Sequence, residues 1–256
     1  MLQGGTSNQG LVLRVGNTVH RPRSRGSEAT HALLRHLEHV GFDGAPRVLG
    51  IDDRGREVLS FVPGTAVVPP YPAWALTEGA LASVAGLLRR YHEAVRGFDP
   101  TPHVWGSQVP AAFRTGLVSH NDPNLDNIIF RDGEAVALID FDLASPGSAL
   151  WDVAMAARLW VPLRDPRDVP DARAEAVLDR LRLFVTEYGL PESDRRRVAA
   201  AALQNHVWSY DIVHAGALRG QPGYRDFWTA AARAHDERGR QWLSGNLRAL
   251  DAALAR

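Results

Sequence analysis

His120-Asn121-Asp122-Pro123-Asn124-Leu125-Asp126-Asn127, followed by Ile139-Asp140-Phe141-Asp142, is the most informative part of this chain. Between the two polar segments lie two apolar runs, 127–130 and 135–140, which flank the turn signal at 131–134. Short apolar runs around a glycine-containing turn predict a β-hairpin. Since a hairpin returns the chain on itself, Asp140 is expected close to Asn127, although they are 13 positions apart.

The residue types in these segments suit phosphoryl transfer. The order H-x-D-x-x-x-x-N, hairpin, aspartate is the catalytic arrangement of kinases. In this order Asp122 orients the attacking hydroxyl and accepts its proton, while the Asn127 amide and the Asp140 carboxylate supply hard oxygen ligands for Mg²⁺. The alternative is a polar turn between two helices. Three linked pieces in the right order favour the catalytic interpretation.

The rest of the chain predicts an α+β fold in which a small sheet precedes a helical region. Strands are expected near 11–15 and 18–21, around a Gly-Asn turn, and near 47–51 and 57–62, with one amphipathic helix over 28–37. Pro63-Gly64 marks a boundary that divides the chain into domains 1–62 and 63–256. Helical periodicity in the second domain predicts helices over 75–95, 149–160, 172–188, 195–215 and 227–254.

In its polar segments the chain resembles the aminoglycoside phosphotransferase family, within the broader protein-kinase-like fold. The loop at 120–127 is also similar to that of choline and ethanolamine kinases. Leu150-Trp151-Asp152-Val153-Ala154 looks like the family's tryptophan–aspartate helix start, and 57–64 is similar to the strand and Pro-Gly that link its two lobes. The resemblance covers most of the chain.

The resemblance implies a bilobal protein-kinase-like fold: a small nucleotide-binding lobe of antiparallel sheet with one helix, then a larger, mostly helical catalytic lobe. It further implies ATP or GTP as donor, Mg²⁺, and a small acceptor that carries a hydroxyl. Ser60 and Val62, in the linking strand, become candidates for nucleotide contacts. Asp152 is expected to bind loop backbone, and His120 to brace the catalytic loop.

The chain departs from the family where the donor phosphates bind. The chain contains 29 arginines and no lysine. The family's third strand carries a lysine toward the phosphates, and Arg21 is the position that matches. A guanidinium keeps the charge and can bind phosphate in a bidentate manner. Arg23 and Arg25 are alternatives for this role.

Two other parts of the nucleotide site rest on weaker patterns. Gly5 lies in a glycine-rich segment ahead of the first strand, where backbone amides can approach phosphate oxygens, unless the segment is a flexible terminus. The family's small-lobe helix supplies a glutamate that orients the phosphate-binding cation. Glu28 is the only acid near the start of that helix, and it equally suits the helix dipole.

Composition excludes several classes of protein. Without cysteine or lysine there is no disulfide scaffold, cysteine nucleophile, lysine Schiff base or P-loop lysine. The 29 basic and 29 acidic residues balance, which predicts neither nucleic acid nor an anionic membrane as partner. No signal peptide or membrane-spanning run is visible, so a cytoplasmic location is expected.

We therefore expect a small-molecule kinase, with a nucleotide-binding pseudoenzyme as the main alternative. A metal hydrolase that uses Asp122, Asp140 and Asp142 is a third possibility. The candidates for the acceptor pocket are six polar and aromatic residues at helical spacing: Gln204, Asn205, His206, Tyr210, Asp211 and His214. Residues 142–256 carry 15 acids and 16 arginines, and this balance argues against a polycationic acceptor.

Overall fold

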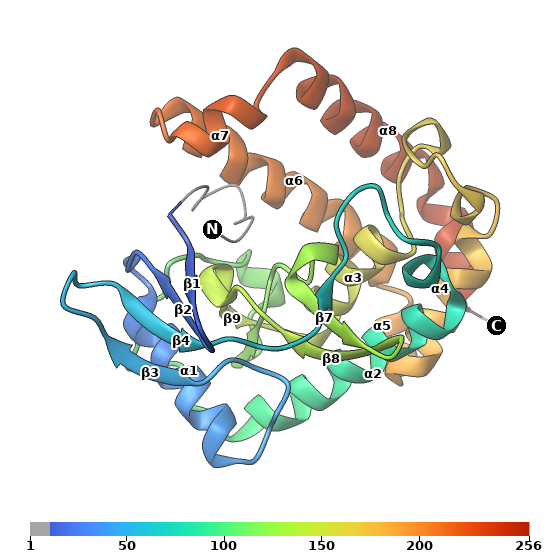
Figure 1. Cartoon of the computed structure of the whole chain (residues 1–256). Helices are drawn as coiled ribbons and strands as arrows, with labels where there is room; N and C mark the ends of the chain where they lie inside the picture. The colour runs from blue at the N-terminus through green and yellow to red at the C-terminus, as the bar shows by residue number, and fades with distance from the viewer. Residues whose placement is uncertain (1–10, 256) are drawn as a thin grey trace.

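The computed structural model describes residues 11–255 and begins with a four-stranded antiparallel sheet (Figure 1). Its strands are β1 (Leu13–Val15), β2 (Thr18–Arg21), β4 (Glu57–Ser60) and β3 (Val48–Ile51), in that spatial order. Helix α1 (Ser27–His39) buries Leu33, Leu34 and Leu37 beneath this sheet. The predicted small sheet with one helix is confirmed.

The chain leaves β4 through Pro63-Gly64 and joins a second sheet at once. There β5 (Thr65–Ala66) pairs with β7 (Ile128–Arg131), which forms the predicted hairpin with β8 (Glu134–Leu138). A third sheet pairs β6 (Leu117–Ser119) with β9 (Ser145–Gly147). The sequence did not indicate β5, β6 or β9, because these strands have two or three residues and, unlike β1, pair with strands far away in the sequence, so no hairpin turn marks them.

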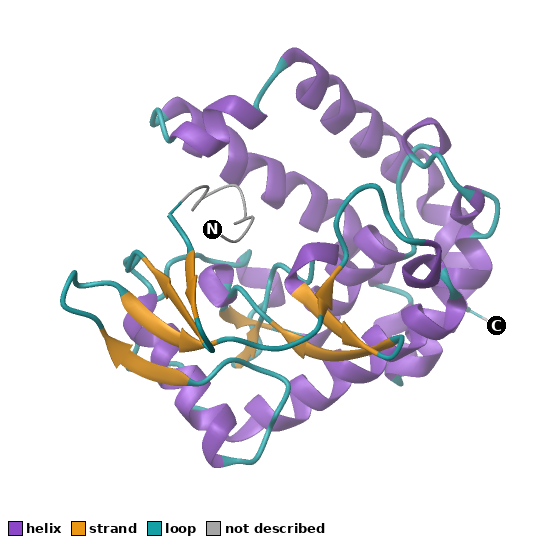
Figure 2. Cartoon of the chain, in the orientation of Figure 1, coloured by secondary structure: helices purple, strands orange, loops and turns teal. Residues whose placement is uncertain are grey.

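One α-helix lies between β5 and β6, and helices make up most of the chain after the hairpin, as Figure 2 shows. They are α2 (Glu78–Ala94), α3 (Ala149–Trp160), α4 (Val177–Tyr188), α5 (Glu192–Arg195), α6 (Val198–Leu218), α7 (Pro222–Phe227) and α8 (Ala230–Leu254). The α+β class and the prediction for 149–160 are therefore confirmed. No helix in the described part of the chain is long and apolar enough to cross a membrane.

Side-chain caps lie at three places where the predicted helix limits were wrong, whereas the helix predicted over 195–215 is divided into α5 and α6 without one. The helix predicted over 227–254 is interrupted, because the Thr229 side chain accepts a hydrogen bond from the Ala232 amide and starts α8 afresh. Likewise, Thr77 accepts from the Ala80 amide and separates α2 from a 3-10 turn before it. The interval 172–188 begins as a separate 3-10 turn capped by Asp171.

Helix α2 forms the centre of the larger region. It packs against α4 and β8, while α3 packs against α6 and α6 against α8. Its side chains at Leu81, Val84, Leu88 and Tyr91 are completely buried. The Tyr91 hydroxyl donates to the Val118 carbonyl at 3.1 Å, which ties the core to the strand that leads into the catalytic loop.

Gly64 sets the approach of the linking segment to the hairpin. Its φ is 141°, and a Cβ atom there would lie 2.4 Å from Cγ2 of Ile129 and 2.6 Å from the carbonyl oxygen of Phe130. Both values are far inside van der Waals contact, so only glycine allows this approach. Gly50 has the same φ of 141° but no atom within 4 Å of its would-be Cβ.

We predict that Gly64→Ala lowers the free energy of unfolding by more than Gly50→Ala does. Both variants take on backbone strain of about 1–3 kcal/mol. Gly64→Ala adds an overpacking cost of about 1–3 kcal/mol, because β7 must move. Urea unfolding measures both losses. Equal losses in the two variants would contradict the close approach at Gly64.

Candidate active site

The catalytic loop is held by its backbone. Asn121 has a left-handed conformation, with φ of 67°. Asp152, in the first turn of α3, accepts from the His120 amide at 2.6 Å with one oxygen and from the Asn121 amide at 2.8 Å with the other. These two bonds stabilise a conformation that costs energy for a non-glycine residue. The prediction that Asp152 binds loop backbone is confirmed.

Asp152 is completely buried and is itself positioned by a second layer of hydrogen bonds. His92 of α2 bonds to it through Nε2 at 3.0 Å, and Nδ1 of His92 lies 2.8 Å from the hydroxyl of Tyr188 in α4. One carboxylate therefore joins the catalytic loop to three helices. A buried charge with this many partners is satisfied rather than costly.

His120 connects the loop to the end of the hairpin. Its Nε2 donates to the Ile139 carbonyl at 3.0 Å, and its Nδ1 accepts from the Asp122 amide at 3.3 Å. Burial lowers the pKa of this imidazole, which favours the neutral form that the two bonds require. The ring also packs edge-on against Phe141 at 4.6 Å between centroids. His120 thus braces the loop, as predicted.

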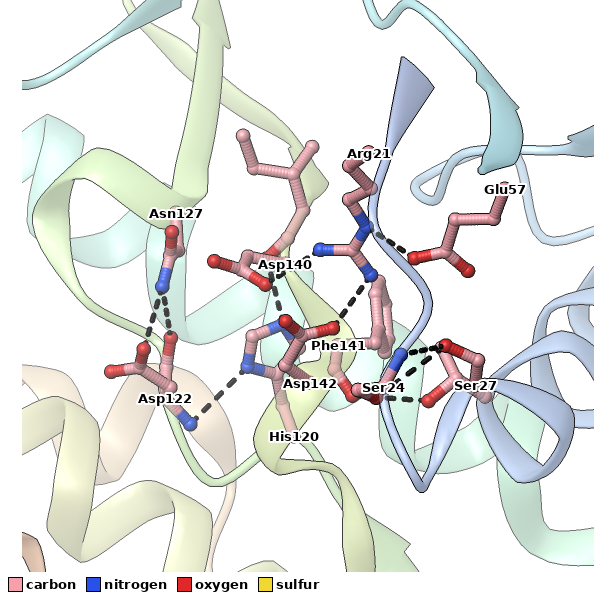
Figure 3. Close-up of polar contacts among 12 residues, drawn as sticks. Arg21, Ser24, Ser27, Glu57, His120, Asp122, Asn127, Asp140, Phe141 and Asp142 are labelled. Carbon is pink, nitrogen blue, oxygen red and sulfur yellow. Dashed lines mark hydrogen bonds and ion pairs between the residues drawn. The ribbon is translucent and has the colours of Figure 1, made fainter. Parts of the chain in front are cut away.

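Asp122 and Asn127 face each other across the loop, as Figure 3 shows. The Nδ2 of Asn127 donates to Oδ2 of Asp122 at 2.9 Å and to its carbonyl oxygen at 3.0 Å. Both partners are acceptors, so the orientation of the amide is fixed and its Oδ1 remains available. Burial, with repulsion from Asp140 and Asp126, raises the pKa of Asp122 to about 7.

Arg21, at the end of β2, lies among three carboxylates (Figure 3). Its Nε donates to Glu57 at 2.5 Å, its Nη1 to Asp140 at 2.9 Å and its Nη2 to Asp142 at 2.6 Å. The side chain is 8% exposed. Burial opposes its charge, but the three carboxylates outweigh burial and raise the pKa of Arg21 above its ordinary value. Arg21 thereby joins the first sheet to the end of the hairpin.

The partner of Arg21 on the small-sheet side was not foreseen. Glu28 is 87% exposed and bonds to Arg23, so it does not orient Arg21. Glu57 takes that place, because the antiparallel register sets Arg21 directly opposite Glu57. Helix α1 contributes His31 instead, whose Nε2 bonds to Glu57 at 2.5 Å. The sequence did contain a signal for this pair: Arg21 is the last residue of one predicted strand, and Glu57 is the first residue of another.

Other predicted nucleotide contacts are not brought into this cluster. Gly5 lies outside the described residues. The Ser60 side chain is engaged elsewhere, since its Oγ accepts a hydrogen bond from the amide of Arg47, the residue before β3, at 2.8 Å. Neither Ser60 nor Val62 is among the described residues that line the cleft containing Asp122.

The donor set suits a cation that binds few protein ligands. No group of three or more histidine and acidic side chains within residues 11–255 is arranged to hold a metal ion. Asn127 and Asp140 offer an amide oxygen and a carboxylate, and Mg²⁺ typically takes one or two carboxylates with water and substrate phosphates. Asp140 has φ of 60°, a strained conformation that is typical of functional sites. The residues present therefore fit Mg²⁺.

A cleft of about 1040 Å³ opens over Asp122 and Asp140. Its lining combines the catalytic loop with residues from α3, α6, α7 and α8 and from the segment 162–173. Among the candidates at 204–214, His206 and Tyr210 line it. The volume is large enough for a small ligand beside the catalytic loop.

This fold and site define a kinase-like phosphotransferase, and comparison with known proteins agrees. A family model described as the phosphotransferase enzyme family matches residues 103–184, which contain both polar segments. The trifolitoxin immunity protein of Rhizobium leguminosarum bv. trifolii is 31% identical over 254 residues, which cover 95% of each chain. The chain belongs to the phosphotransferase enzyme family, and the resemblance drawn from its motifs is confirmed.

Solved structures confirm the bilobal kinase-like fold. A choline/ethanolamine kinase family protein from Mesorhizobium loti superposes with a TM-score of 0.63 at 18% identity, over 95% of this chain and 88% of that one. The GDP complex of an aminoglycoside 2'-phosphotransferase superposes with a TM-score of 0.56 at 15% identity, over 99% of this chain and 91% of that one.

We predict that Glu57→Gln destabilises the protein, whereas Glu28→Gln does not. The first change removes a buried charge that accepts from both Arg21 and His31, and a hydrogen bond to a charged group contributes about 1.5–3 kcal/mol. The second affects only an exposed pair with Arg23, which contributes little. Urea unfolding compares the two variants. A stable Glu57→Gln protein would show that Asp140 and Asp142 suffice to hold Arg21.

Proposed function

We propose that this protein is a small-molecule kinase that transfers the γ-phosphate of ATP or GTP to a hydroxyl group of a small acceptor. The observation that carries the proposal is the convergence of Asp122, Asn127 and Asp140 at one cleft, on a loop and a hairpin held by Asp152 and His120. We assign residues 1–62 to nucleotide binding and 63–256 to catalysis and acceptor binding. A kinase that draws on cellular nucleotide would act in the cytoplasm.

Asp122 would act directly on the acceptor. It orients the hydroxyl and takes up its proton as the oxygen–phosphorus bond forms, while the bond from the γ-phosphorus to the bridging oxygen breaks and the nucleoside diphosphate leaves. A pKa of about 7 suits a group that gains and loses a proton in each cycle. Asn127 keeps this carboxylate in place through its amide nitrogen.

Asn127 Oδ1 and the Asp140 carboxylate would hold Mg²⁺, which neutralises phosphate charge. Arg21 would bind the donor phosphates. Its Nε stays on Glu57, which His31 holds from the other side. Its Nη1 and Nη2, now on Asp140 and Asp142, would turn to phosphate oxygens as the nucleotide enters.

A nucleotide-binding pseudoenzyme is the second candidate, and one observation favours it. Arg21 closes over the carboxylates of Asp140 and Asp142, the groups nearest the expected metal and phosphates. If the nucleotide cannot displace these ion pairs, the protein would bind partners without turnover.

The trifolitoxin immunity protein, to which the chain is similar, suggests a defined acceptor to test for the kinase function. A kinase can confer immunity by phosphorylating a toxin, so trifolitoxin belongs in the acceptor panel.

We predict magnesium-dependent transfer from labelled ATP or GTP to at least one hydroxyl compound. Asp122→Asn should lower kcat by about 10²–10⁴-fold, the contribution of a positioned base. Asp126→Asn, on the same loop and lining the same cleft, is the matched control and should stay within about threefold of wild type. Nucleotide binding without transfer to any acceptor would favour the pseudoenzyme. An active Asp122→Asn protein would remove Asp122 as the base.

We also predict that Arg21→Gln raises KM for the nucleotide about tenfold or more, since a charge-assisted phosphate contact is lost. Arg23→Gln is the control, because Arg23 lies two residues further on, pairs with Glu28 and itself lines the cleft. Steady-state kinetics with varied nucleotide give both values. The opposite ranking would assign the phosphate contact to Arg23.

A further inference from the structure

Two arginines in the wall of the cleft have no acidic partner. Arg158 lies in α3, and Arg164 lies in the segment that follows it. Both line the same cleft as Asp122. Among the described residues neither forms an ion pair, and the hydrogen bonds of Arg158 go only to Ser209 and to the sulfur of Met155. Arg164 makes one long hydrogen bond, 3.5 Å, to the Arg158 carbonyl.

Two other arginines in or beside this wall are paired with acids, whereas Arg25 and Arg219, which also line the cleft, are exposed to solvent. Arg173 binds Asp171 at 2.8 Å, and Arg238 binds Asp168 through two nitrogens. Asp168, which lines the cleft, is therefore already bound to Arg238.

Leaving Arg158 and Arg164 without an anion has an energetic cost. Nε of Arg158 is buried and has no hydrogen-bond partner. Burial, followed by repulsion from Arg164, lowers the pKa of Arg158 to about 10. Burial likewise lowers the pKa of Arg164. Two neighbouring guanidinium groups that are poorly solvated and lack a counterion favour binding of an anion, because that anion restores both the charge balance and the missing acceptors.

The position of this pair relates it to the reacting hydroxyl. Arg158 lines the same cleft as Asp122 and makes no hydrogen bond to it. Tyr210 lines the same cleft as the two arginines. Burial raises the pKa of its hydroxyl, although the positive charges of Arg158 and Arg164 act in the opposite direction. A small molecule with its hydroxyl at Asp122 can therefore extend toward the arginines.

Resting on the proposed kinase function, we propose that the acceptor carries an anionic group, a carboxylate or a phosphate, in addition to its hydroxyl, and that Arg158 and Arg164 bind this group. The pair then selects against cationic acceptors and sets the end of the molecule that is presented to Asp122. An alternative in which Arg158 serves only as the counterion of Asp122 gives no role to Arg164.

The test uses four compounds that share a hydroxyl-bearing three-carbon frame and differ in charge. They are glycerol, 3-amino-1,2-propanediol, glycerate and glycerol 3-phosphate. Binding to the full chain, saturated with magnesium and nucleotide, is followed by tryptophan fluorescence, since Trp208 lines the cleft. Phosphoryl transfer to each compound is measured in parallel. The variants are Arg158→Gln and Arg164→Gln, and Arg167→Gln is the control, because Arg167 is 75% exposed and pairs with Asp165.

We expect one or both anionic compounds to bind at least tenfold more tightly than the neutral and cationic ones. Loss of a charge-assisted bond in Arg164→Gln should weaken anion binding about 10- to 100-fold, with the melting temperature and nucleotide affinity unchanged. Arg164→Gln is the decisive variant. The Arg164 side chain makes only one long hydrogen bond, to the Arg158 carbonyl, so its loss should leave folding intact. The preferred compound shows whether the group is a carboxylate or a phosphate.

Three results would overturn the inference: no anion binding, equal or tighter binding of the neutral or cationic compounds, or anion binding that Arg164→Gln leaves intact. These outcomes separate the two proposals. Transfer only to neutral or cationic acceptors would refute the anion site and leave the kinase standing. Anion binding that depends on both arginines, without transfer to any hydroxyl compound, would refute the kinase and leave the anion site standing.

Discussion

The ion pairs of Arg21 hold the two ends of the active site together. The guanidinium binds Glu57 in its own sheet and Asp140 and Asp142 beyond it, so strand β2 and the end of the hairpin meet through one side chain. Burying an arginine is costly unless its donors are satisfied, and for Arg21 three carboxylates satisfy them. Those carboxylates repel one another and exceed the charge of Arg21, which leaves negative charge for a cation to neutralise. The same constraint therefore fixes the geometry and prepares the metal site.

A second network determines where Asp122 stands relative to this cluster. Asp152 holds the two amides that start the loop, and His120 reaches from the loop to the carbonyl just before Asp140. The proposed base, Asp122, and the proposed metal ligand, Asp140, are thus linked through the imidazole of His120, without any substrate. Because both networks are buried, the site is formed before any ligand enters. Catalysis by positioning and electrostatics needs this pre-organisation.

The sequence predicted the catalytic loop, the hairpin and the small sheet, because each has a local signature: fixed spacing of polar residues, a glycine turn or a period of two. It failed where a contact depends on register. The choice of Glu57 over Glu28 as partner of Arg21 follows from which residues face each other across β2 and β4, and a helix-based family pattern pointed to the wrong element. The unpaired Arg158 and Arg164 were equally invisible, since pairing is decided by tertiary contacts.

Overall charge balance also concealed how charge is divided within the cleft. Carboxylates gather at the catalytic end, where Asp122, Asp140 and Asp142 lie, while the unpaired arginines lie in the wall beyond. Opposite charges at the two ends of one cleft orient a ligand, because a molecule with an anion at one end lowers its energy in only one direction. Arginine suits both positions. The guanidinium of Arg21 can keep its Nε on Glu57 while its two Nη atoms exchange partners. In the cleft wall, Arg158 and Arg164 stay charged although they are poorly solvated. A chain without lysine would thus use one residue type both for the proposed phosphate contact, where Arg21 is paired with acids, and for the proposed acceptor wall, where Arg158 and Arg164 are not.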